Sequence, residues 1–153
     1  MKGEPMKIVS FVVPGEPMGK GRPKFDTRGP YVRAVTPQRT INYETLIKME
    51  YERRYEGFAF PKEVPLCMRI VAYCSIPKSA SKKKILAMLS NLLFPTKKPD
   101  WDNIGKVVCD ALNKIAFYDD SQITDGRVLK RYSENPRLEV TIHPEESFPE
   151  RMD

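Results

Sequence analysis

The stretch from Lys97 to Asp125 constrains the fold of this chain most, because it combines many carboxylates with a regular apolar pattern. Six of the 20 acidic side chains in the 153-residue chain lie here. They are Asp100, Asp102, Asp110, Asp119, Asp120 and Asp125. Such a concentration of like charge calls for a structural or functional reason.

A helix is predicted over residues 103–116, where apolar residues recur at the spacing of one helix face. Asp102 stands at the expected N-cap, where a carboxylate accepts from free backbone N–H groups and is favoured by the helix dipole. Asp102, Lys106 and Asp110 follow one another at steps of four, so they line one stripe beside the buried face. The apolar positions are Ile104, Val107, Val108, Ala111, Leu112 and Ile115.

The carboxylates on either side of this helix suit a hard divalent cation. Asp100 and Asp102 flank the helix start, and Asp119 and Asp120 follow its end. Mg²⁺ takes oxygen ligands, keeps several waters and is held by a few carboxylates together with substrate phosphate. Taken singly, each Asp is better explained by a helix cap or a solvated turn. Taken together, with basic residues on both sides, they indicate a metal site.

Several short motifs carry a family resemblance. The string PDWDN at 99–103, Lys106, DALN at 110–113 and DDSQI at 119–123 resembles the signature of the RusA family of Holliday junction resolvases. The stretch PGEPMGKGRPKF at 14–25 is similar to the basic loop of phage and prophage members of that family.

The resemblance implies a homodimeric, Mg²⁺-dependent crossover junction endodeoxyribonuclease that nicks four-way DNA junctions in recombination and repair. It implies that Mn²⁺ can replace Mg²⁺. The family's metal-binding aspartates match Asp100, Asp102 and Asp120, and its catalytic lysine matches Lys106. These four are the expected catalytic residues.

Composition supports one domain over residues 1–153 and a polyanionic partner, because the formal net charge is +6 despite the acidic motif. The cysteines number three, lack CxxC spacing and are predicted to be free thiols in a reducing compartment. No membrane-spanning run or signal peptide is predicted, so we expect a cytoplasmic protein without a membrane partner.

Residues 14–36 are predicted to form a basic flexible loop, because prolines and glycines are mixed with cations there. Phe25 and Tyr31 are candidates for stacking on unpaired bases. The alternative is a loop that only aids solubility. The expected DNA-binding residues, from this loop and from the stretch before Asp100, are Lys20, Arg22, Lys24, Arg33, Lys97 and Lys98.

The remaining chain predicts an α+β fold, a mixed β-sheet with helices packed on it. Expected strands cover 7–13, 64–76, 122–132 and 137–142, the last two paired through a turn at 133–136. Expected helices cover 37–56, opened by Thr36-Pro37, and a stretch from Ser79 or Ser81 to just before Pro95 with a broad apolar face. The tail 144–153 is expected to fray, and His143 is not expected to act as a base.

These observations predict a nuclease whose aspartates hold one or two Mg²⁺ ions while Lys106 stabilises charge at the scissile phosphate. One active site in each subunit of a dimer would cut a junction symmetrically in opposing strands. Two alternatives remain open. The chain could be a non-catalytic module that binds junctions or single-stranded DNA, or a nuclease for flaps and forks.

Overall fold

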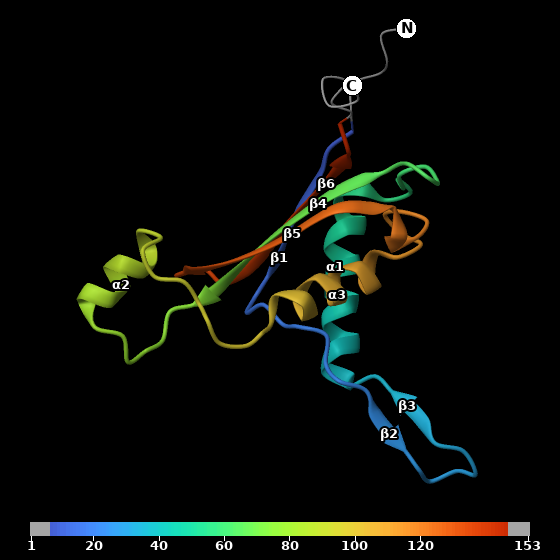
Figure 1. Cartoon of the computed structure of the whole chain (residues 1–153), viewed down its shortest axis with the longest axis horizontal. Helices are drawn as coiled ribbons and strands as arrows, with labels where there is room; N and C mark the ends of the chain where they lie inside the picture. The colour runs from blue at the N-terminus through green and yellow to red at the C-terminus, as the bar shows by residue number, and fades with distance from the viewer. Residues whose placement is uncertain (1–6, 147–153) are drawn as a thin grey trace, which may run out of the picture.

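A four-stranded mixed sheet forms the centre of the computed structural model, which describes residues 7–146 (Figure 1). Its strand order is β1 (Val9–Pro14), β6 (Arg137–Pro144), β4 (Leu66–Ser75) and β5 (Ile123–Ser133). β6 runs antiparallel to both β1 and β4, whereas β4 and β5 are parallel. The predicted α+β fold with a mixed sheet is therefore confirmed.

The predicted pairing of the last two strands is wrong. β4 lies between β5 and β6, so the turn at 133–136 connects two strands that are not neighbours. β4 and β6 are the two interior strands, and the burial of β4 fits that position. Its alternate residues from Leu66 to Cys74 are buried, and Val71 on its opposite face is also buried.

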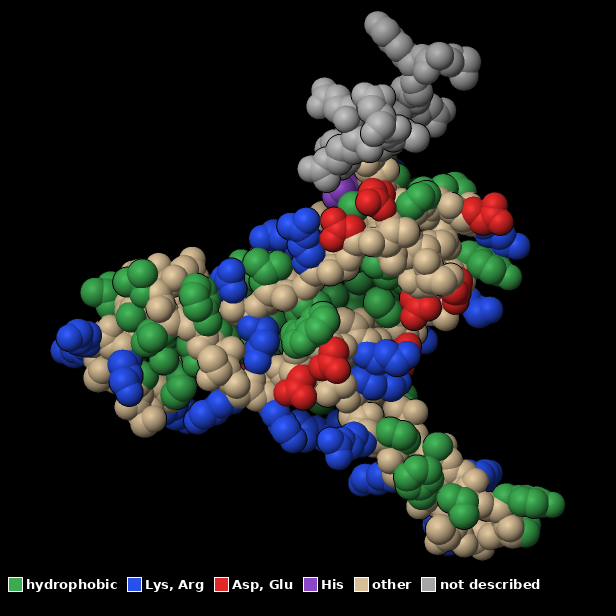
Figure 2. Space-filling model, viewed as in Figure 1, with side chains coloured by type: hydrophobic (Ala, Val, Ile, Leu, Met, Phe, Trp, Pro, Cys, Tyr) green, Lys and Arg blue, Asp and Glu red, His purple; other side chains and the backbone are tan. Residues whose placement is uncertain are grey.

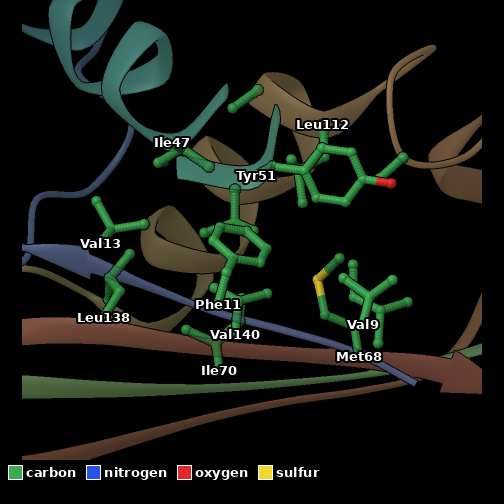
Figure 3. Close-up of a cluster of buried hydrophobic side chains, with 14 of the residues drawn as sticks. Val9, Phe11, Val13, Ile47, Tyr51, Met68, Ile70, Leu112, Leu138 and Val140 are labelled. Atoms are coloured by element: carbon green, nitrogen blue, oxygen red, sulfur yellow. The ribbon is translucent and has the colours of Figure 1, made fainter. Parts of the chain in front are cut away.

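Two helices cover one face of the sheet and enclose the core (Figure 1). They are α1 (Gln38–Tyr55) and α3 (Trp101–Leu112). The inward side chains of β1 pack against α1, where the rings of Phe11 and Tyr51 meet edge to face with centroids 5.7 Å apart (Figure 3). This packing fixes the position of α3, which carries the predicted site.

The helix ends differ from the predictions by a few residues. Pro37 is the N-cap of α1 instead of its first helical residue, and the cap makes no side-chain hydrogen bond. Asp100 is the N-cap of α3, so Asp102 lies in the first helical turn instead of at the cap. α3 ends at Leu112, before the predicted end at Ala116. Asp102 is consequently free of a capping role.

The helix predicted before Pro95 is shorter and does not contribute the expected core face. α2 spans Lys82–Leu89, and the hydroxyl of Ser81 caps it by accepting from the backbone N–H of Lys84 at 3.3 Å. Met88 is its buried residue, whereas the side chains of Leu86, Leu89, Leu92, Leu93 and Phe94 are exposed. α2 contacts β5 at one end of the sheet and lies outside the layer formed by α1 and α3 (Figure 1).

Regular structure also forms within the predicted flexible loop at 14–36, contrary to expectation. β2 (Lys24–Asp26) and β3 (Arg33–Val35) pair antiparallel as a separate two-stranded sheet. This hairpin projects away from the body (Figure 1). We call residues 22–35 the arm.

The start of β1 and the end of β6 lie at the same end of the sheet, where Val9 pairs with Ile142 (Figure 1). β6 continues to Pro144, and the backbone N–H of Glu145 donates to the carbonyl of Pro65 at 2.8 Å. The rest of the predicted tail, residues 147–153, lies outside the described residues. Between residues 7 and 146, no helix is both long and apolar enough to cross a membrane.

Candidate active site

Helix α3 presents the predicted charged stripe at the edge of its buried face. Five of its apolar residues are completely buried against the sheet and α1. Asp102 and Lys106 are exposed, and Asp110 is half-buried one turn further on. The amphipathic pattern therefore places these three groups along the solvent side of the helix, as the sequence predicts.

A small cavity of about 220 Å³ lies between α3 and β5. Asp102 and Arg127 are the charged residues in its lining, and most of the remaining wall is apolar. The indole of Trp101 at its rim is 65% exposed, which is unusual for the largest apolar side chain. Asp102 therefore stands at the mouth of a mostly apolar hollow.

The Asp119-Asp120 pair has two different roles. Asp119 is the N-cap of a short 3₁₀ helix, η1 (Asp120–Gln122), and its carboxylate accepts from the backbone N–H of Ser121 at 3.2 Å. Hydrogen bonds from Ser121 hold the pKa of Asp119 below its usual value. Local structure occupies this carboxylate and leaves that of Asp120 available.

The buried side chain of Gln122 holds this turn in place. Its carbonyl oxygen accepts from the backbone N–H groups of Tyr118 and Asp119 at 2.9 and 3.1 Å. Its amide nitrogen donates to the carbonyls of Pro61 and Val64 at 2.9 and 3.1 Å. These four hydrogen bonds attach the turn, which contains Asp120, to the segment before β4.

The carboxylate of Asp120 lies close enough to α3 to affect its charged groups. Its charge contributes to raising the pKa of Lys106. Burial, followed by the charges of Asp120 and Asp110, raises the pKa of the Cys109 thiol to about 11. Cys109 also lines the cavity that Asp102 borders, so the wall of this cavity contains Asp102 and a thiol on which Asp120 acts.

Lys106 belongs to a chain of four alternating charges. Its ammonium contacts Asp110 Oδ1 at 2.9 Å, and the other oxygen of Asp110 lies 3.1 Å from Lys20 Nζ. Lys20 Nζ also contacts Glu44 Oε1 at 2.6 Å. This network joins α3, the segment before the arm and α1.

The network keeps Lys106, Asp110 and Lys20 ionised at neutral pH. Burial alone would raise the pKa of Asp110, but hydrogen bonds from Lys106 and Lys20 hold it below its usual value. The hydrogen bond to Asp110 raises the pKa of Lys106. Burial disfavours charge on Lys20, yet its bonds to Glu44 and Asp110 raise its pKa. A permanently charged ammonium is therefore held at Lys106.

The donor chemistry fits a hard cation, although the described side chains do not form a complete cage. Across residues 7–146, no three His, Cys, Asp or Glu side chains are grouped to hold a metal. In that same range, Asp100, Asp102 and Asp120 make no ion pair. Mg²⁺ commonly needs one or two protein carboxylates, with waters and substrate phosphate as further ligands.

The predicted DNA-binding residues occupy different environments. Arg22, Lys24, Lys97 and Lys98 are exposed to solvent. Arg33 is also exposed and lies 3.5 Å from Asp26 within the arm. Lys20 has a side chain only 23% exposed and bonded to two carboxylates, so it anchors the root of the arm. Figure 2 shows acidic and basic side chains side by side on this face, between α2 and the arm.

Sequence reasoning missed three residues that organise the site. Glu44 on α1 contacts Lys20, and no local motif connects residues so distant in sequence. Arg127 lines the cavity, but in the sequence it only follows the Asp125-Gly126 pair, and nothing in that pattern indicates a functional residue. Gln122 completes a capping box with Asp119, which the Asp-x-x-Gln spacing could have revealed.

Comparison with known proteins identifies the family of this chain. Residues 14–143 match the family described as Endodeoxyribonuclease RusA. The chain is also 37% identical over 142 residues to the Uncharacterized protein YqaN of Bacillus subtilis (strain 168), which covers 90% of this chain and 96% of that relative. The class is thus that of the endodeoxyribonucleases, hydrolases that cut within DNA chains.

Within that class, the chain belongs to the RusA family, as the motifs at 99–123 predict. The family acts on junction DNA, and its resolvases depend on divalent metal ions.

Proposed function

We propose that this protein is a Mg²⁺-dependent, structure-selective endodeoxyribonuclease that resolves four-way DNA junctions by paired symmetric nicks in recombination and repair. The observation that carries the proposal is the position of Asp120, whose charge acts on the ammonium of Lys106, with Asp102 one helical turn before Lys106 on α3. Neither Asp102 nor Asp120 makes an ion pair among residues 7–146. Anionic metal ligands and a fixed cation together suit the hydrolysis of a phosphodiester, because both stabilise negative charge that develops at the phosphate.

The aspartates supply the ligands in this proposal. Asp102 and Asp120 hold the cation, with Asp100 at the N-cap as the third candidate ligand. Mg²⁺, or Mn²⁺ in its place, supplies Lewis-acid catalysis at the phosphate when bound. The hydrogen bonds of Gln122 orient Asp120, because they fix the backbone of its turn.

Lys106 stabilises the negative charge that develops on the scissile phosphate. Its side chain is 58% exposed, so it can reach a DNA backbone lying across α3. Asp110 restricts the directions in which the ammonium can point, and Lys20 balances the second oxygen of Asp110. Exposed Arg22, Lys97 and Lys98 then hold the flanking phosphates.

The working unit in this proposal is a homodimer in the cytoplasm. A four-way junction with two-fold symmetry is resolved when each of two related subunits cuts one of two opposing strands. A genomic DNA substrate and three free cysteines both suit the reducing compartment that contains the chromosome.

The test compares cleavage of an end-labelled synthetic four-way junction with cleavage of a flap, a fork and a linear duplex. The wild type should cut the junction symmetrically in Mg²⁺ and should be inactive in a chelator. Equal cutting of flaps and forks would favour a general branched-DNA nuclease. Binding without any cleavage would favour a non-catalytic module.

Two variants locate the activity. Asp102→Asn should abolish cleavage and leave junction binding unchanged or tighter, because one negative charge near the phosphates is removed. Glu139→Gln is the matched control, because Glu139 lies between inward-facing Leu138 and Val140 and therefore on the sheet face opposite the helices. Normal cleavage by Asp102→Asn would refute the metal assignment.

A further inference from the structure

The arm exposes apolar side chains that an ordinary surface loop would not. The side chains of Phe25, Tyr31 and Val32 are 69%, 79% and 68% exposed, although the body contains a fully buried core. Figure 1 shows the arm standing clear of the body, and Figure 2 shows hydrophobic side chains along it. A cluster of exposed apolar groups at the end of a projecting element marks a contact surface.

The arm is internally ordered and carries a surplus of positive charge. Asp26 is its acidic residue, and the carboxylate accepts from the backbone N–H and the side chain of Arg28 at 3.0 Å. Arg33 lies 3.5 Å from the same carboxylate. Phe25 therefore lies on a short two-stranded ladder and Tyr31 in the connection between its strands. The single acid of the arm is paired with arginine, while Arg22 and Lys24 remain exposed.

The root of the arm is fixed to the helix that carries the catalytic residues. The backbone N–H of Lys20 donates to the carbonyl of Asn103 at 2.9 Å, one residue after Asp102. Gly19 lies so close to α3 that an added Cβ would be 2.8 Å from the Cβ of Asn103. On the other side, the N–H of Gly21 donates to the hydroxyl of Thr40 at 3.0 Å. The arm therefore starts at a fixed position relative to Asp102.

Cations beside exposed aromatic rings fit a nucleic acid whose base faces are accessible. The cations bind phosphates on any DNA, whereas the rings bind only where a base can be approached face-on. A linear duplex hides its base faces in the stack, but a branch point exposes them. Contact between two copies of the arm would instead bring like charges together.

We propose that the arm docks at the branch point of a DNA junction, where Phe25 and Tyr31 stack on exposed bases, and that this contact selects branched DNA over duplex. The inference rests on the function proposed above and assigns the selectivity of that site to the arm. The fixed root then sets which phosphate reaches Lys106.

The test replaces the two rings without removing their apolar character. Phe25→Leu/Tyr31→Leu is compared with Val35→Ala, a change to an aliphatic side chain on the same arm outside the cluster of Phe25, Tyr31 and Val32. Dissociation constants of the full-length variants for a four-way junction and for a duplex are measured in chelator at fixed salt. A 2-aminopurine at the branch point reports stacking by its fluorescence.

Stacking contributes about tenfold in affinity for each base. The aromatic variant should therefore bind the junction about tenfold to a hundredfold more weakly, bind the duplex normally and lose the 2-aminopurine quenching. The valine variant should resemble the wild type. Equal weakening on duplex and junction, or equal effects of both variants, would overturn the proposal.

Further outcomes separate the two proposals. Unchanged junction affinity and fluorescence in the aromatic variant would overturn the role of the arm, even if the wild type cuts junctions. A change in oligomeric state by sedimentation equilibrium would instead show that the arm contacts a second copy. A wild type that does not distinguish junction from duplex would overturn the proposed function itself.

Discussion

Replacing Lys106 with alanine separates a structural from a catalytic role for this ammonium. The side chain is 58% exposed, and its ion pair with Asp110 is an i,i+4 contact on a helix surface. Such pairs contribute about 0.3–0.5 kcal/mol. Asp110 keeps its second partner, Lys20, at 3.1 Å, so the substitution leaves no half-buried carboxylate unpaired.

The expected effect on stability is therefore small. For a chain of this size, 1 kcal/mol changes the melting temperature by about 2–4 °C, so Lys106→Ala should melt within about 2 °C of the wild type. The expected effect on catalysis is large. A preorganised charge at a reacting phosphate contributes about 3 kcal/mol, which corresponds to a rate lowered by about a hundredfold.

The assay is single-turnover cleavage of a labelled four-way junction at saturating enzyme, which removes differences in binding. Lys78→Ala, at an exposed lysine beyond the end of β4, serves as the control and should cleave normally. Lys106→Arg should restore little activity, because a planar fork does not place its charge where a compact ammonium does. A rate for Lys106→Ala within about threefold of the wild type would show that this lysine only balances its acidic neighbours.

Three further substitutions test the support of the site. Asp110→Asn should lower the free energy of unfolding by about 1 kcal/mol at pH 7 in urea titrations. Because the folded pKa of Asp110 is depressed, this difference should be lost as pH falls through that value, and a constant difference down to pH 2 would contradict it. Gln122→Leu should destabilise by about 1–3 kcal/mol, measured by the same titrations, because buried backbone groups lose their partners. Gly19→Ala should destabilise by about 1–3 kcal/mol and slow junction cleavage, because the new Cβ would meet Asn103; a wild-type melting curve would show that the root of the arm can move.

Local patterns in the sequence predicted the elements but not their neighbours. Apolar periodicity and turn residues depend on a few adjacent positions, so the strands of the main sheet and the buried face of α3 could be predicted. The insertion of β4 between β5 and β6 depends on burial across the whole chain, which no window of sequence contains. The exposure of the apolar side chains of α2 could not be predicted for the same reason, because an apolar pattern within one helix does not show which other element covers that face.

The site shows the same division. The alignment of Asp102, Lys106 and Asp110 along one stripe of α3 could be predicted, because the helix period fixes which residues share a face. The two roles of Asp119 and Asp120 depend on a capping box that is visible in the sequence but competes with many other uses of Asp. The anchoring of Lys20 by Glu44 needs the contact between α1 and the segment before the arm, which exists only in the folded chain.

The separate pairing of β2 and β3 has a consequence for how this enzyme can diverge. The arm leaves the body at Gly21 and returns at Pro37, where an added Cβ on Gly21 would lie 3.1 Å from the proline ring. Its strands pair only with each other, so insertions or deletions between them shift no register in the main sheet. Doubling the length of such a loop costs only about 0.6 kcal/mol. Under the role proposed for the arm, a change in its tip would alter the preference for DNA shape and leave the main sheet and α3 unchanged.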